Sequence, residues 1–133
     1  MELSIEFLVD VAKDAGKKIL GIYEQNFQNW EKEDRSPLTE ADLYAHQIIT
    51  AELKAKYPDI PQLSEESKEI PYEERKHWGE FFLIDPLDGT KEFIKKNGEF
   101  TVNIAFIRQG KPVAGVVHAP VLETTYYADQ AQG

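Results

Sequence analysis

Cysteine is absent from the 133 residues of the chain, which excludes disulfide bonds and thiolate metal sites. No apolar run approaches the ~20 residues that a helix needs to cross a bilayer. The acidic amino terminus also lacks the basic start and apolar run of a secretory signal. Basic charge is scarce, because 15 Lys and Arg residues oppose 24 Asp and Glu residues and leave a formal net charge of -9. A chain this acidic lacks the basic surface expected of a protein that binds nucleic acid or a membrane surface. The absences described above fit a cytoplasmic protein.

The hydrophobic pattern predicts one domain of the α+β class over residues 1–133. Apolar residues at spacings of three and four predict helices over residues 4–26 and 39–56, the second capped by Thr39. Short apolar or alternating stretches predict four strands: residues 80–84, 100–107, 113–119 and 124–128. A five-residue loop, 108–112, is expected to join two of them as a hairpin. The predicted fold is a helix pair packed on a mostly antiparallel sheet.

The sequence Asp-Pro-Leu-Asp-Gly-Thr, from Asp85 to Thr90, follows the predicted strand at 80–84. Asp85 and Asp88 can point at one spot, because proline fixes a backbone angle and Gly89 permits a tight turn. Hard cations such as Mg2+ prefer oxygen ligands of this kind. The N–H groups of Gly89 and Thr90, at the start of an expected short helix, favour a phosphate. A plain strand-ending turn is the alternative, since Asp, Pro and Gly are common turn formers.

A pair of adjacent glutamates, Glu65 and Glu66, follows the apolar residue Leu63. Taken alone, such a pair is more often a solvated acidic loop. A further carboxylate near Asp85 and Asp88 would suffer like-charge repulsion. Two metal ions about 3.5–4 Å apart would resolve that repulsion. The other carboxylates therefore favour a metal-binding role for the pair.

Thr39 and Asp42 have the spacing of a capping box, with Asp in place of the usual Glu or Gln, and the sequence alone favours this role. In the functional alternative, Asp42 and Thr90 orient a water whose pKa metal ions have lowered. The gap between Asp85 and Asp88 is one residue longer than in the Asp-x-Asp motif of haloacid-dehalogenase-like phosphatases. Along a strand end this shift changes the side-chain directions, which favours metal-activated water over an aspartyl-phosphate intermediate.

Together these stretches resemble the inositol monophosphatase superfamily of Mg2+-dependent, lithium-sensitive phosphatases, in which a Glu-Glu pair precedes Asp-Pro-x-Asp-Gly-Thr. Four stretches, residues 36–42, 63–66, 88–95 and 97–105, are most similar to the bacterial 3′(2′),5′-bisphosphate nucleotidases of this superfamily. The resemblance covers nearly the whole chain. It implies hydrolysis of the 3′-phosphate of a small phosphorylated nucleotide, 3′-phosphoadenosine 5′-phosphate or its sulfated relative, in sulfate assimilation.

The resemblance also implies a role for each matching residue. Glu65, Asp85 and the backbone carbonyl of Leu87 would hold one Mg2+, Asp85 and Asp88 a second, and Asp42 and Thr90 would activate the water. The implied substrate-binding residues are Glu65, Leu87, Asp88, Gly89 and Thr90. Two or three Mg2+ ions are expected, with Li+ as an inhibitor.

The family's second half carries a Trp-Asp-x-Ala-type motif that has no match, because Trp30 and Trp78 are followed by Glu31 and Gly79. We therefore expect the chain to be the amino-terminal, metal-binding half of a layered α/β/α/β/α sandwich, and a poor enzyme alone. Two alternatives stay open: an inositol monophosphatase-type sugar phosphatase, and a truncated, non-catalytic metal-binding module that self-associates through its uncovered sheet. The resemblance leaves a peripheral place at the inner membrane open for an otherwise cytoplasmic protein.

Overall fold

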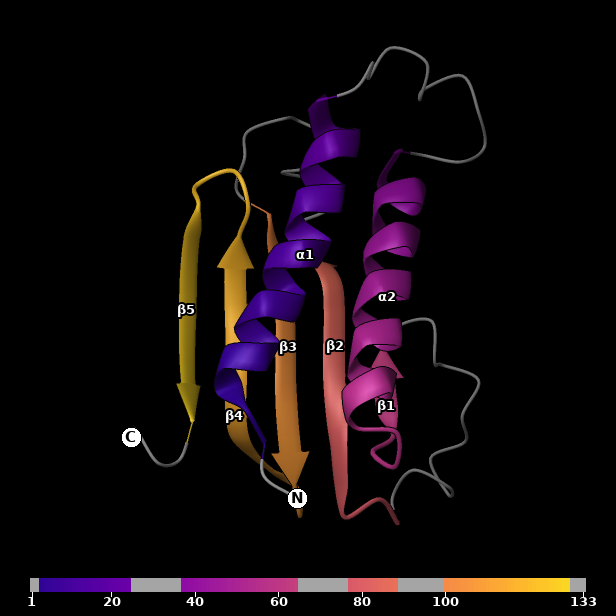
Figure 1. Ribbon diagram of the computed structural model, residues 1–133, viewed down its shortest axis with the longest axis vertical. Coiled ribbons are helices and arrows are strands. Elements are labelled where there is room, and N and C mark those ends of the chain that lie inside the picture. The colour runs from indigo at the N-terminus through magenta and orange to yellow at the C-terminus, as the bar shows by residue number, and fades with distance from the viewer. Residues whose placement is uncertain (1–2, 25–36, 65–76, 89–99, 130–133) are drawn as a thin grey trace.

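Two helices lie side by side on one face of a five-stranded sheet (Figure 1). The computed structural model describes the backbone of residues 3–24, 37–64, 77–88 and 100–129. The elements in chain order are α1 (Ile5–Glu24), α2 (Pro37–Lys56), β1 (Gln62–Ser64), β2 (Glu80–Asp88), β3 (Thr101–Arg108), β4 (Lys111–Ala119) and β5 (Thr124–Asp129). The predicted helix pair on a mostly antiparallel sheet is confirmed.

The strands lie in sequence order across the sheet, from β1 at one edge to β5 at the other. β1 pairs with β2 in parallel, and each later neighbouring pair is antiparallel. The carboxyl ends of β1 and β2 therefore lie at the same end of the sheet as the start of β3. The amino-terminal end of α2 reaches that end as well (Figure 1). This arrangement brings segments that are distant in the sequence to one end of the molecule.

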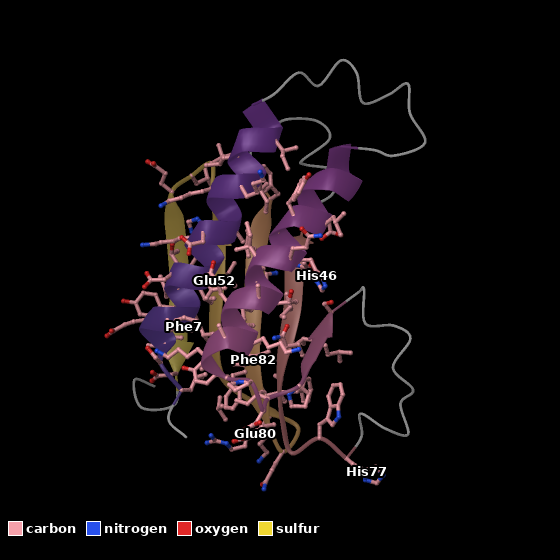
Figure 2. The ribbon with its side chains drawn as sticks, turned by 45° about the vertical axis from the view of Figure 1, so that its right-hand side comes forward. Phe7, His46, Glu52, His77, Glu80 and Phe82 are labelled. Atoms are coloured by element: carbon pink, nitrogen blue, oxygen red, sulfur yellow. The ribbon has the colours of Figure 1, made fainter. Side chains whose placement is uncertain are left out.

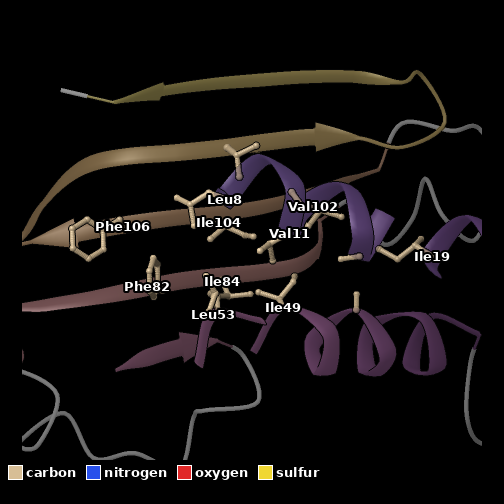
Figure 3. Packing of buried hydrophobic residues seen from close by; sticks show 14 of the residues in the cluster. Leu8, Val11, Ile19, Ile49, Leu53, Phe82, Ile84, Val102, Ile104 and Phe106 are labelled. Atoms are coloured by element: carbon tan, nitrogen blue, oxygen red, sulfur yellow. The ribbon is translucent and has the colours of Figure 1, made fainter. Parts of the chain in front are cut away.

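The hydrophobic core fills the space between the helix pair and the sheet (Figure 3). Phe82 is fully buried there, with its ring centroid 5.3 Å from that of Phe106 and 5.6 Å from that of Tyr57. Burying one such side chain contributes about 1.5–3 kcal/mol. The ion pair between Arg108 and Glu80, whose side chains are 44% and 40% exposed, contributes about 1 kcal/mol at most. Burial of apolar side chains between the helices and the sheet therefore contributes more to this fold than the exposed ion pair within the sheet does.

The β3–β4 hairpin is tighter than the five-residue loop predicted over residues 108–112. Gln109 and Gly110 form its two-residue turn, with φ angles of 50° and 79°. Two successive positive φ angles give a turn whose twist matches that of the flanking strands. Pro112 belongs to β4 and pairs with Ile107 at a register irregularity, where the missing N–H of a proline is tolerated.

Three other boundaries also differ from the sequence prediction. Helix α2 begins at Pro37 rather than after Thr39, since the fixed φ of proline suits the first position of a helix. Strand β1 was not predicted, and β2 continues through the expected turn to Asp88. The end of the first predicted helix, beyond Glu24, and the short helix expected after Gly89 lie outside the described residues.

A carboxylate cluster lies where α1 and α2 pack together. Burial raises the pKa of Glu52 on α2 to about 7, helped by the charge of Asp14 on α1, a hydrogen bond to it, and the charge of Asp10. Figure 2 shows Glu52 on the side of α2 toward α1. A carboxyl whose pKa is raised in the folded state binds a proton more tightly there than in the unfolded chain. The fold therefore loses stability as the pH rises from about 4.5 to about 7.

We expect Glu52→Gln to leave stability nearly unchanged at pH 5 and to raise it at pH 8. The gain should be about 1 kcal/mol, because solvent screens a side chain that is only partly buried. Urea unfolding at both pH values measures the difference. Glu6→Gln, at an exposed position of α1, controls for the loss of one negative charge. An equal effect of Glu52→Gln at both pH values would contradict the assignment.

Candidate active site

The pairing of β1 with β2 brings the two predicted acidic motifs to one end of the sheet. Ser64, the last residue of β1, pairs with Ile84 of β2. Glu65 follows Ser64 in the chain and Asp85 follows Ile84, so each lies one residue beyond a paired position. Because the strands are parallel, the carboxyl end of β1, which Glu65 follows in the chain, lies at the same end of the sheet as Asp85 of β2. Glu65 itself lies outside the described residues.

Strand β2 carries a bulge within the Asp-Pro-Leu-Asp motif. Asp85 pairs with Asn103 of β3, and Asp88 pairs with Thr101, so a step of three residues along β2 is matched to a step of two along β3. A two-residue step separates positions on one face of a strand, and a bulge inserts one extra residue and bends the strand. Such bulges are common next to active sites. The side chain of Asp88 lies outside the described part of the structure.

The side chain of Asp85 is partly buried and lies on the face of the sheet opposite the helices. Its neighbour Ile84 faces the core, and alternation along the strand turns Asp85 away. On this open face it joins Asn103 in the lining of a shallow groove of about 490 Å³. The other groove residues include the exposed apolar side chains of Val117 and Tyr126. Self-association through this face stays a prediction.

Asp42 lies in the second turn of α2 and is partly buried. The capping box that the sequence favoured requires Thr39 to precede the helix as its N-cap. The helix instead begins at Pro37, two residues earlier. Helix ends commonly vary by one or two residues, and the side chain of Thr39 lies outside the described part of the structure, so the capping box stays a prediction. Asp42 lies near the end of α2 that reaches the carboxyl ends of the strands (Figure 1).

Two residues that the sequence analysis did not assign also lie at this end. Nδ1 of His46, one turn after Asp42 on α2, is 3.3 Å from Oγ of Ser64. Asn103 pairs with Asp85 across the sheet. A polar residue between the buried Val102 and Ile104 is a sequence signal for the open face. His46 has no such signal, because its partner lies 18 residues away in the chain.

The remaining predicted site residues lie outside what the structure describes. These are Glu65, Gly89 and Thr90 entirely, and the side chains of Leu87 and Asp88. Among the described residues, no group of three His, Asp or Glu side chains could hold a metal ion. Of the predicted metal-ligand carboxylates, Asp85 is the one whose side chain the structure describes. Carboxylate and carbonyl oxygens are the donors that Mg2+ prefers over nitrogen or sulfur, so this donor set fits the ion.

The fold is that of an α+β protein, with a helix pair packed on a mostly antiparallel sheet. Its candidate site has a carboxylate, Asp85, near the end of a strand. The chain belongs to the inositol monophosphatase family, whose sequence model matches residues 1–133. Neither of the helices in the described ranges is long and apolar enough to cross a membrane.

Individual members of the family allow a more specific comparison. The chain is 51% identical over 130 residues to the 3′(2′),5′-bisphosphate nucleotidase CysQ of Salmonella typhimurium, covering 96% of this chain and 52% of the relative. The crystal structure of CysQ from Bacteroides thetaiotaomicron is 47% identical, with a TM-score of 0.87 over 97% of this chain and 46% of that chain. An inositol monophosphatase from Staphylococcus aureus is 27% identical, with a TM-score of 0.80 over 96% and 46%. The resemblance predicted from the sequence is confirmed, and the chain spans about half the length of these relatives.

Proposed function

We propose that the protein at its natural length hydrolyses the 3′-phosphate of 3′-phosphoadenosine 5′-phosphate, and of its 5′-phosphosulfate relative. The observation that carries the proposal is the parallel pairing of Ser64 with Ile84. Ser64 directly precedes Glu65 in the chain and Ile84 directly precedes Asp85, so this pairing supports one site for both carboxylates. The nucleotide is chosen because relatives named as bisphosphate nucleotidases share 51% and 48% of matched residues with this chain. Such a nucleotide is an intracellular metabolite, so the proposal includes a cytoplasmic location.

Magnesium is the proposed cofactor, as two or three ions. Bound there, the ions would lower the pKa of the attacking water and neutralise phosphate charge, and lithium would inhibit. This supply of positive charge matters in a chain of net charge -9 that must bind an anion. The proposed ligands are Glu65, Asp85, the Leu87 carbonyl and Asp88.

The chain's own residues accept the proton, orient the attacking water and bind the phosphate. Asp42 accepts the proton of the attacking water, and the hydroxyl of Thr90 orients that water between them. The backbone N–H groups of Gly89 and Thr90 donate to the scissile phosphate. Glu65 and Asp88 also contribute to the binding of the phosphate. Support for Asp42 comes from its place in the second turn of α2, at the end that reaches the strand ends.

Hydrolysis of an inositol phosphate is the second candidate function. It is favoured by a related staphylococcal enzyme, 26% identical, whose structure holds inositol monophosphate. The same enzyme has also been solved with 2′-AMP, at 25% identity. A site of this kind therefore takes both ligand classes in a relative. The nucleotide ranks first for this chain because the named nucleotidases are about twice as similar to it in sequence.

Phosphate release tests the proposal, with 3′-phosphoadenosine 5′-phosphate and inositol 1-phosphate as parallel substrates. The assay compares the 133-residue chain with the protein at its natural length, each with Mg2+ and with EDTA. We expect the natural-length protein to prefer the nucleotide and to lose all turnover in EDTA, and the 133-residue chain to be a poor enzyme. A preference for inositol 1-phosphate would favour the second candidate. No turnover by either form would favour a non-catalytic metal-binding module.

A further inference from the structure

Two side-chain contacts tie α2 to β1. Nδ1 of His46 lies 3.3 Å from Oγ of Ser64, and the side-chain amide of Gln62 donates to the carbonyl of Thr50 at 3.2 Å. The earlier helix residue meets the later strand residue, so α2 and β1 run in opposite directions. Figure 2 shows His46 on the side of α2 toward β1.

The two ties match in spacing. His46 and Thr50 are four residues apart on the helix, which is about 6 Å along its axis. Gln62 and Ser64 are two residues apart on the strand, which is about 6.6 Å. Both contacts form at the same axial position of α2 relative to β1. A shift of either element by one residue along its axis would break both contacts. Each tie therefore holds one end of β1 against α2 at this register, His46 at the carboxyl end and Gln62 at the amino end.

The tie made by His46 is the one nearer the site. Asp42 lies four residues before His46, so both are on the same side of the helix, one turn apart. Ser64 is 7% exposed and pairs with Ile84, directly before Asp85. It directly precedes Glu65 in the chain. His46 and Ser64 thus join the element that carries the proposed proton acceptor to the strand end that carries the proposed ligands.

We propose that His46 is a positioning residue for the phosphatase site. Through Ser64 it holds the carboxyl end of β1 at a fixed height along α2, and so sets Asp42 relative to the strand ends at Ser64 and Asp85. This inference rests on the proposed function. A misplacement of about 1 Å at such a site can cost about 10²-fold in rate. Residues that orient ligands from behind typically contribute about 10–100-fold in metal affinity or activity.

The variants separate the contact from the bulk of the side chain. His46→Phe keeps a ring without Nδ1, and Ser64→Ala removes the hydroxyl from the other side. His46→Asn carries a polar atom close to the place of Nδ1 and serves as the rescue variant. Gln62→Met is the matched control, because it breaks the equivalent tie one helical turn further from the site.

The experiment measures kcat and KM at the natural length, and Mg2+ affinity without substrate by titration calorimetry. Circular dichroism gives the folded fraction of each variant. We expect His46→Phe and Ser64→Ala each to lower kcat and Mg2+ affinity about 10–100-fold with KM unchanged. His46→Asn should recover most of both. Gln62→Met should lower the unfolding midpoint and leave kcat unchanged.

Two outcomes would overturn the inference while the proposed function stands. In the first, the wild-type protein turns over substrate, and His46→Phe and Ser64→Ala keep its kcat and Mg2+ affinity. In the second, Gln62→Met lowers kcat as much as His46→Phe does, which would show that general loosening of α2 is the cause. A wild-type protein that hydrolyses no phosphate ester would overturn the proposed function and the positioning role together.

Discussion

Replacing Asp85 with asparagine should lower phosphate release from the natural-length protein by about 10²–10³-fold, the range for losing one preorganised electrostatic group. Asparagine keeps the shape of the side chain, but its neutral amide is a weaker ligand for Mg2+ than a carboxylate. The position also remains paired with Asn103 at the bulge of β2. The loss should therefore come from charge and metal binding and not from a change of fold.

Thermal unfolding separates these two causes. A ligand that binds the folded state raises its stability, so Mg2+ should raise the melting temperature of the wild type. It should have no such effect on Asp85→Asn, whose stability without Mg2+ should match the wild type. Asp59→Asn, at an exposed position after α2, is the control for the loss of one charge. Full activity of Asp85→Asn, or an unchanged Mg2+ response, would remove Asp85 from the site.

Gly16→Ala should destabilise the fold by about 1–3 kcal/mol, the usual cost of forcing an extra methyl group into a packed site. A Cβ at Gly16 would lie 2.8 Å from Cδ2 of His118 and 3.1 Å from Cγ of Pro120. The His118 ring cannot easily give way, because its Nδ1 is 2.8 Å from Oγ1 of Thr125. Burial, with a smaller effect of the Lys13 charge, lowers the pKa of His118, which favours the neutral form of the ring where it packs against α1.

Gly21→Ala provides the matched comparison on the same helix. Apart from its chain neighbours and the backbone of its own helix, no heavy atom of the described residues lies within 4 Å of the place that its Cβ would take. Alanine is favoured over glycine by about 1 kcal/mol in an open helix interior, so this variant should be more stable than the wild type. Urea unfolding of both variants gives the two signs. A stable Gly16→Ala protein would show that His118 and Pro120 move aside at little cost.

The parts of the fold that were predicted from the sequence are those set by local periodicity. Apolar residues at spacings of three and four indicated α1, and three of them, Leu8, Val11 and Ile19, are fully buried. Alternation likewise indicated β3, where Val102, Ile104 and Phe106 are buried. Short features were missed. Strand β1 has three residues, too few to show a period, and its existence depends on pairing with β2.

Candidate site residues could be predicted only where the side chains that suggest the chemistry lie close together in the sequence. The Asp85 motif was found because two carboxylates flank a proline, but the bulge that carries it depends on pairing with Asn103 and Thr101 of β3. The contact of His46 with Ser64 depends on the packing of α2 against β1. Such contacts between distant segments follow from tertiary packing, which leaves no local pattern. The roles of Glu65 and Thr90 stay predictions.

Phosphate release from 3′-phosphoadenosine 5′-phosphate by the natural-length protein, with Mg2+ and after EDTA, tests the central claim most directly. The claim is that carboxylates gathered at one end of the sheet hold Mg2+ for hydrolysis of this nucleotide. We predict turnover with Mg2+, loss of turnover in EDTA, its return when Mg2+ is restored, and a clear preference over inositol 1-phosphate. Turnover that survives EDTA, or no turnover of the nucleotide at any Mg2+ concentration, would contradict the claim.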